Sequence, residues 1–123
     1  MRRCILIAIS VLKKTKKSEK ELSDRIAREF AAELRRRLGD RIQKIILYGS
    51  RARGDFWEGS DFDFLAIVGA KDRDLEEQIL DLEVEFLNLY DELLTTQVLS
   101  PRDWEVESWS PWGYNIQKEG VAL

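Results

Sequence analysis

Asp61 and Asp63 stand one residue apart at the start of an apolar stretch and could together hold a divalent cation. Side chains alternate along a strand, so these two carboxylates point to the same face. Two carboxylates that converge repel each other, and a divalent cation removes that cost. The sequence has no histidine, so a metal here is held by oxygen, which favours Mg²⁺ or Mn²⁺, with Ca²⁺ a further possibility.

Gly49 and Ser50 lie ten residues upstream, at the end of another apolar stretch, and suit an anion such as phosphate. Glycine allows a close ligand approach, and a helical turn after it directs free N–H groups and the Ser50 hydroxyl at an anion. Arg51 and Arg53 would add positive charge. Each piece alone has an ordinary explanation as a cap, a turn or a solvated arginine. The occurrence of all these pieces in this order along the chain is a more specific indication of a phosphate and metal site than any piece alone.

The composition narrows the possible classes of protein. The chain has 123 residues, of which 44% are hydrophobic, so one domain with one core is expected. Without histidine, Ser-His-Asp and Cys-His catalysis are excluded. The single cysteine allows no disulfide within the chain, which favours a cytoplasmic setting.

The first 17 residues are interpreted as an N-terminal arm, and residues 18–123 as the domain. The arm carries nine mostly apolar residues, too few to span a bilayer, and lysines follow where a signal peptide would have a cleavage site. It could be a strand or helix packed on the domain, an arm used in a homo-oligomer, or a mis-started leader. No membrane association is expected.

Charge is distributed unevenly along the chain. Residues 1–53 carry 16 Lys/Arg and 6 Asp/Glu, whereas residues 54–123 carry 4 and 17. This asymmetry could steer a charged partner, although solvated helix faces explain it as well. The net charge of −3 and the lack of a known nucleic-acid-binding motif argue against nucleic acid as the main partner.

Hydrophobic periodicity predicts an α/β (α+β) fold, with helices flanking a small mixed β-sheet. An apolar stripe of Leu22, Ile26, Phe30 and Leu34 predicts the first helix, and Leu75 to Leu89 predict the second. Pro101 after Ser100 opens a short helix. The expected order is helix 18–38, strand 42–49, strand 61–68, helix 72–91, strand 93–99, helix 100–107 and an irregular tail with a short extended piece.

The stretch "LYGSRARGDFWEGSDFDFLAIV" resembles the signature of the DNA polymerase beta nucleotidyltransferase superfamily, and its wording is similar to the minimal nucleotidyltransferases of bacteria and archaea. The tail "YNIQKEGVAL" is also similar to family tails of the form Asn-Ile-x-x-Glu-Gly. The resemblance covers roughly residues 20–123 and implies the nucleotidyltransferase fold.

The resemblance implies that Gly49 and Ser50 bind the triphosphate, and that Asp61 and Asp63 hold Mg²⁺ (or Mn²⁺) for transfer of a nucleoside monophosphate from ATP or another NTP. Some minimal members pair as antitoxins with a HEPN-type RNase toxin, and some add AMP to a tyrosine of that partner. A protein partner is therefore expected.

The sequence departs from the family on the strand after the second helix. Active members commonly carry a third carboxylate there, and this chain has Thr95 at the matching position. A hydroxyl is a poor substitute for a carboxylate. Either the nearby Glu92 swings in, or a partner supplies the acid, or the protein binds nucleotide or neutralises a toxin without catalysis. Trp57, in the loop between the two motif halves, could stack on a base or press on a partner.

The other three tryptophans, Trp104, Trp109 and Trp112, gather near the C-terminus. Large aromatic side chains bury much apolar surface, so packing in the core or tail is expected for them.

Overall fold

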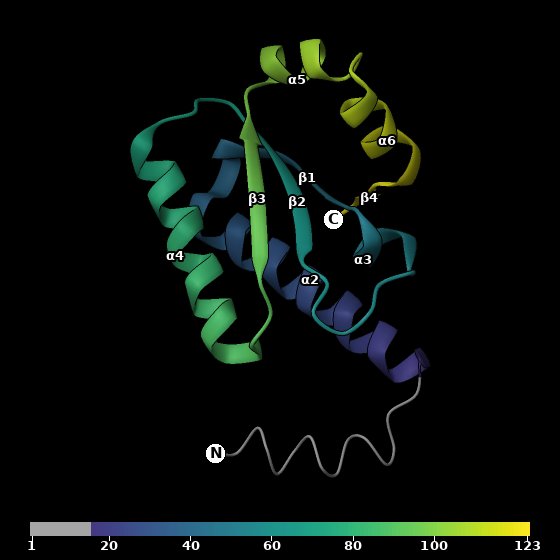
Figure 1. Ribbon diagram of the computed structural model, residues 1–123. Coiled ribbons are helices and arrows are strands. Elements are labelled where there is room, and N and C mark those ends of the chain that lie inside the picture. Colours follow the sequence, from purple (N-terminus) through teal and green to yellow (C-terminus); the bar gives the residue numbers. More distant parts are fainter. Residues whose placement is uncertain (1–15) are drawn as a thin grey trace.

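The computed structural model describes residues 16–123, and the prediction for an N-terminal arm falls largely outside them. Figure 1 shows a small sheet with the long helix α2 (Lys16–Leu38) running behind it. A single turn, η1 (Gly39–Arg41), leads from α2 into strand β1 (Ile42–Tyr48). None of the helices within residues 16–123 is long and apolar enough to cross a membrane.

The sheet is mixed, as predicted, with the strand order β3-β2-β1-β4. Strand β2 (Phe62–Val68) pairs antiparallel with β1 and parallel with β3 (Leu94–Leu99). Helix α4 (Arg73–Tyr90) connects the two parallel strands. Parallel strands such as β2 and β3 need a crossover connection of this kind, because a tight turn reverses the chain direction and can join only antiparallel strands.

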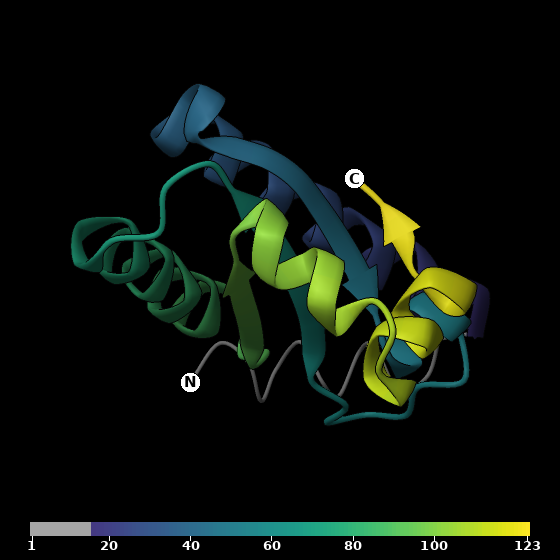
Figure 2. The same cartoon turned by 90° about the horizontal axis from the view of Figure 1, so that it is seen from above.

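Both faces of the sheet are covered by helices, over part of their area. The larger core joins α2 and α4 to one face, through residues such as Phe30, Phe64 and Phe86. The smaller core lies on the other face, where Leu65 and Ile67 meet Ile116 of helix α6 (Pro111–Glu119). Figure 2 shows α5 (Pro101–Glu107) and α6 on that side of the sheet. The even and odd positions of β2 therefore face different cores.

In both long helices the residues of the predicted apolar stripe are buried, with one exception in each helix. Ile26, Phe30 and Leu34 of α2 are buried, but Leu22 is 44% exposed. In α4 the stripe is buried from Leu75 to Phe86, and Leu89 is exposed. The stripes therefore fix which face of each helix meets the sheet, and they fail within one or two turns of a helix end.

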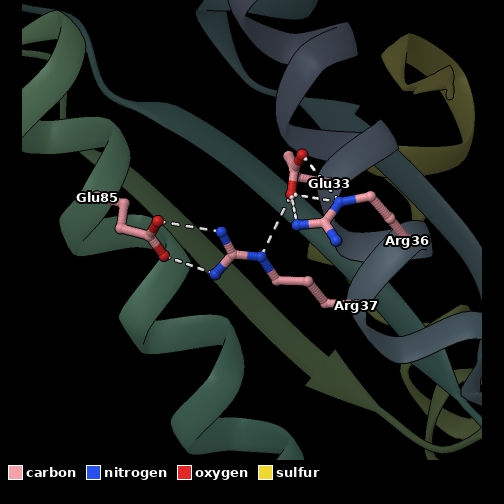
Figure 3. A network of polar contacts seen from close by, with 4 residues as sticks. All are labelled: Glu33, Arg36, Arg37 and Glu85. Atoms are coloured by element: carbon pink, nitrogen blue, oxygen red, sulfur yellow. Dashed lines mark hydrogen bonds and ion pairs between the residues drawn. The ribbon is translucent and has the colours of Figure 1, made fainter.

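An ion-pair network joins α2 to α4 (Figure 3). The Arg37 guanidinium donates to both oxygens of Glu85, at 2.5 and 3.0 Å, and to Glu33 at 3.3 Å. Arg36 donates to the same Glu33 carboxylate at 2.8 Å. Hydrogen bonds from Arg37 lower the pKa of Glu85, and those from Arg36 lower that of Glu33. The basic end of α2 thus meets the acidic face of α4, which gives the uneven charge distribution a structural role.

The tail contradicts the prediction of an irregular segment. Residues Pro111–Glu119 form helix α6, with Pro111 at its start and the Ser110 side chain accepting a hydrogen bond from Gly113 N. Strand β4 (Val121–Ala122) then pairs with β1, so the short extended piece is confirmed. The cap signal of Ser followed by Pro is the same one that identified α5, and it occurs twice. The sequence therefore held the information for α6.

Glu83 is a carboxyl group partly buried between α4 and β3. Its Oε2 atom has no hydrogen-bond partner among the described residues, and neither does Oγ1 of Thr96. Burial raises the pKa of Glu83, and the neighbouring Thr96 lowers it to a lesser extent. The folded protein therefore holds this proton more tightly than the unfolded chain does.

We expect Glu83→Gln to stabilise the protein at pH 7 by about 1 kcal/mol, because a neutral amide carries no buried charge. The raised pKa means that wild-type stability falls as pH rises from the unfolded value of Glu83 through its folded value. The advantage of the variant should therefore shrink toward pH 4. Denaturant unfolding at several pH values measures this, with Glu105→Gln on the exposed face of α5 as the control. An advantage that is constant with pH contradicts the prediction.

Candidate nucleotide and metal site

Strand β1 ends where its chain turns closely past β2. Gly49 has φ 77° and ψ −161°, a conformation that is essentially restricted to glycine. A Cβ atom added at Gly49 would lie 2.5 Å from Oδ2 of Asp63. Glycine is therefore required twice, once by the backbone and once by the neighbouring carboxylate. The turn and the carboxylate are in direct contact.

The turn continues into the short helix α3 (Ser50–Arg53), which is the kind of helical turn considered above for the segment after Gly49. The Gly49 carbonyl accepts hydrogen bonds from the N–H groups of Ala52 and Arg53, and Gly54 ends the turn with φ 89°. Ser50 comes directly after Gly49 and is half-buried. The first N–H groups of such a turn have no carbonyl within the helix to bond, so they are available to an anion.

Asp63 lies near the start of β2, which is an inner strand of the sheet. It pairs with Tyr48 of β1 on one side and with Thr95 of β3 on the other. Thr95 Oγ1 lies 3.4 Å from Asp63 Oδ1. The predicted match of Thr95 to the position facing the aspartates therefore agrees with the strand register. Asp61 is exposed just before β2 and shares the parity of Asp63.

The environment of Asp63 favours a positive charge beside it. Burial raises the pKa of Asp63, and the nearby Asp61 charge raises it further. Thr95 and Arg53 act in the opposite direction, with the hydrogen bond from Thr95 the larger of the two effects. Two carboxylates that disfavour each other's charge are the donor set that a divalent cation stabilises. Within residues 16–123, however, no group of three or more acidic or thiol side chains could hold a metal ion.

Arg53 is the cation that lies beside this site. Its guanidinium donates to Asp55 at 3.1 Å and to Glu119 of α6 at 3.0 Å. Hydrogen bonding to Asp55 raises the pKa of Arg53, and Glu119 adds to that shift. Its side chain remains 43% exposed, so it can reach an incoming phosphate. Glu119 was not singled out from the sequence, although it is the acid of the Asn-Ile-x-x-Glu-Gly tail.

Arg51 points away from Asp63, toward the α2 side of the sheet. It is 6% exposed, and it donates to the Ser60 carbonyl at 2.9 and 3.1 Å and to Glu92 at 3.1 Å. The rings of Phe56 and Phe62 each lie 4.3 Å from the centre of its guanidinium. These contacts tie the motif loop to the end of α4. The predicted role of Arg51 in nucleotide binding stays a prediction.

Glu92 is held by Arg51, and the structure does not group it with Asp61 and Asp63 as a set of three acids.

Trp57 is 73% exposed in the loop before β2 and packs near Gly59. Tyr48 is an aromatic residue beside the site that the sequence analysis did not single out. It meets Trp112 of α6 edge-on at 5.9 Å. Burial raises the pKa of Tyr48, and the nearby Asp63 charge also raises it. Its position directly before Gly49 was the available signal.

The C-terminal tryptophans divide into two groups. Trp104 and Trp112 pack against the smaller core, as predicted. Trp109, in the turn between α5 and α6, is 89% exposed, so the prediction of core or tail packing is wrong for it. Trp109 has a serine on each side and lies in the short turn between the two helices.

Comparison with known proteins assigns the fold to a family. The family model described as "Nucleotidyltransferase domain" matches residues 27–106, which include both halves of the motif. The chain belongs to the nucleotidyltransferase family. The resemblance read from the motif is thereby confirmed, as is the expected α/β fold.

Two relatives come from Methanocaldococcus jannaschii. "Putative protein adenylyltransferase MJ0604" is 37% identical over 101 residues, which are 81% of this chain and 96% of the relative. "Putative protein adenylyltransferase MJ1305" is 30% identical over 76% of this chain and 65% of the relative. These relatives agree with the identification of the chain as a nucleotidyltransferase.

Solved structures share the fold at low sequence identity. A structure described as "a putative nucleotidyltransferase from Sulfolobus solfataricus" has a TM-score of 0.56 and 17% identity, covering 89% of this chain and 86% of the other. A toxin–antitoxin structure with AMP-PNP has a TM-score of 0.52 and 16% identity, covering 76% and 69%.

We expect Gly49→Ala to abolish nucleotide binding, because the added methyl group would displace the Asp63 carboxylate. Gly39→Ala is the matched control. Gly39 also has a positive φ, of 57°, but an added Cβ would meet nothing within 4 Å. It should lose about 1 kcal/mol of stability and keep its affinity. Calorimetric titration measures the nucleotide affinity of both variants, and thermal unfolding measures their stability. Near-normal binding by a folded Gly49→Ala variant would count against the site.

Proposed function

We propose that this nucleotidyltransferase carries AMP from ATP to a hydroxyl group on a partner protein, with Mg²⁺ or Mn²⁺ bound by Asp61 and Asp63. The observation that carries the proposal is the contact between the Gly49 turn and the Asp63 carboxylate. It places the segment suited to phosphate beside the segment suited to a metal. The names of the two Methanocaldococcus relatives support a protein as the acceptor.

In this reaction the acceptor oxygen forms a bond to the α-phosphorus of ATP. The bond from that phosphorus to the β-phosphate oxygen breaks, pyrophosphate leaves, and the acceptor proton passes to water. Asp61 and Asp63 would hold the metal ion, which would supply positive charge for the attacking and leaving oxygens. Ser50 and the first N–H groups of α3 would hold the triphosphate, and Arg53 would neutralise part of its charge.

The fit of a metal to this site is partial. The repulsion between Asp61 and Asp63 favours a cation, and two carboxylates plus substrate phosphates are a common set for Mg²⁺. Thr95 supplies neither a third carboxylate nor a base, since a hydroxyl does not accept protons at neutral pH. We infer that transfer proceeds without a general base at position 95 and is slow for that reason.

The partner we propose is a HEPN-type RNase toxin, for which this chain acts as the antitoxin in the cytoplasm. The structural neighbour described as a toxin–antitoxin complex with AMP-PNP supports both the setting and the adenine nucleotide. The acceptor would be a tyrosine of the toxin. A domain of this size offers little surface to enclose a second substrate, so a protein acceptor suits it better than a small molecule. An adjacent gene for a HEPN-like protein would support this pairing.

We expect labelled AMP to pass from [α-³²P]ATP to the partner in the presence of Mg²⁺, and Asp63→Asn to lower the rate at least about 100-fold, because it removes a charged metal ligand. Asp61→Asn should act similarly, and Glu105→Gln should not. Denaturing gels with autoradiography measure the transfer. No transfer by the wild type with any NTP and a verified partner would overturn the proposal.

A second candidate is a non-catalytic module that binds nucleotide or neutralises the toxin by contact. The observation in its favour is Thr95, which lies 3.4 Å from Asp63 where a carboxylate would complete the site. In that case Asp63→Asn would leave neutralisation intact. Loss of neutralisation in Asp63→Asn, with complex formation preserved, excludes this candidate.

We expect Thr95→Asp to raise the transfer rate roughly tenfold or more, because general bases commonly contribute 10²- to 10⁴-fold. Thr95→Asn is the control, since it has the shape of aspartate without its charge. Initial rates at saturating ATP and partner measure the effect. Activity that appears only in Thr95→Asp would favour the non-catalytic candidate for the natural chain, and equal rates in both variants would show that no base is needed at this position.

A further inference from the structure

Thr95 presents a hydroxyl group to the candidate site from the strand on the far side of Asp63. Asp63 pairs with Tyr48 of β1 on one side and with Thr95 of β3 on the other. The Gly49 turn comes directly after Tyr48, so the segment suited to phosphate lies on the β1 side of Asp63. Thr95 therefore lies across Asp63 from the segment that would bind a triphosphate.

The Thr95 hydroxyl is accessible and is not fixed in one orientation. The residue is exposed, and its Oγ1 atom lies 3.4 Å from Asp63 Oδ1 and 3.5 Å from the Phe62 carbonyl oxygen. Both distances are long for a hydrogen bond donated by a hydroxyl group, so neither contact holds the proton firmly. Thr96, the next residue, has the opposite parity on β3, and its Oγ1 atom is buried. Of these two hydroxyls, only that of Thr95 faces the site.

Nucleotidyl transfer sets a requirement on the position of the acceptor oxygen. The attacking and leaving oxygens lie roughly in line on opposite sides of the phosphorus. With the triphosphate on the Gly49 turn, pyrophosphate would leave on the β1 side, and the attacking oxygen would come from the β3 side, where Thr95 lies. The other hydroxyls near Asp63 are on the leaving side. Ser50 belongs to the turn itself, and Tyr48 lies on β1 against Trp112.

We propose that the protein also transfers AMP to its own Thr95, a second activity that rests on the proposed nucleotidyl transfer. The Thr95 Oγ1 atom forms a bond to the α-phosphorus of ATP, and the bond from that phosphorus to the β-phosphate oxygen breaks. Pyrophosphate leaves, and the hydroxyl proton passes to water. The product is a phosphodiester that joins the threonine side chain to adenosine.

Self-transfer has a consequence for the reaction with a partner. An acceptor hydroxyl of the partner would approach from the same side of the site as Thr95, so the two acceptors exclude each other. Each chain has one Thr95 and is modified once at this position. The attached AMP then lies where a partner hydroxyl would enter, and the modified chain no longer transfers AMP.

The test incubates the full chain alone with ATP and Mg²⁺, removes metal and free nucleotide by chelation and desalting, and measures the intact mass. We expect the mass of one AMP to be added, and tandem mass spectrometry of peptides should locate it on Thr95. Thr95→Ser keeps a hydroxyl and should keep the modification, whereas Thr95→Val, which has the same shape without the hydroxyl, should lose it. Thr96→Val is the matched control and should be modified like the wild type. AMP located on another residue, or retained in Thr95→Val, would overturn the proposal.

A parallel incubation with the partner separates this inference from the proposed function. AMP on the partner, with none on the chain when it is incubated alone, would overturn self-transfer and leave the proposed function intact. AMP on Thr95 with none on the partner would support self-transfer and overturn the choice of acceptor. The absence of AMP from both proteins would overturn both proposals.

Discussion

The absence of a side chain at Gly49 is the constraint on which the candidate site depends. A Cβ atom there would lie 2.5 Å from Asp63 Oδ2, so the turn and the carboxylate can be neighbours only with glycine. This closeness brings the start of α3 and the N-terminal end of β2, which carries Asp63, to one point. About ten residues separate these two segments in sequence. The Gly-Ser and Asp-x-Asp halves are thus two sides of one packing contact. They meet because the antiparallel pairing of β1 and β2 puts the end of β1 beside the start of β2.

Arg51 holds in place the loop that joins the Gly-Ser and Asp-x-Asp halves of the motif, from the α2 side of the sheet. A buried guanidinium is costly unless its charge is balanced and its N–H groups are bonded. Here Ser60 and Glu92 accept its hydrogen bonds, and Phe56 and Phe62 cover its two faces. The loop closes around this cation, which fixes where β2 begins and therefore where Asp61 and Asp63 stand.

Strand parity made much of the site readable from the sequence. It placed Asp61 and Asp63 on one face, and the family resemblance matched Thr95 to the position facing them, which agrees with the pairing of Asp63 and Thr95. What could not be read depends on contacts between distant segments. The two arginines of the Gly-Ser-Arg-Ala-Arg stretch are alike in sequence, but α3 turns Arg51 into the interior and leaves Arg53 at the site. Helix α6 was missed although Ser110 and Pro111 mark its start, because its short apolar pattern is interrupted by glycine and asparagine.

The C-terminal tail is part of the candidate site. Strand β4 pairs with β1 directly before the Gly49 turn, Trp112 packs edge-on against Tyr48, and Glu119 binds Arg53. Arg53 is therefore paired before any ligand binds. In the proposed function, a phosphate that recruited Arg53 would replace its ion pair with Glu119, and only the difference between the two interactions would contribute to binding. The exchange would also free a carboxylate beside the nucleotide, and it would link the position of α6 to the affinity for triphosphate through this one guanidinium.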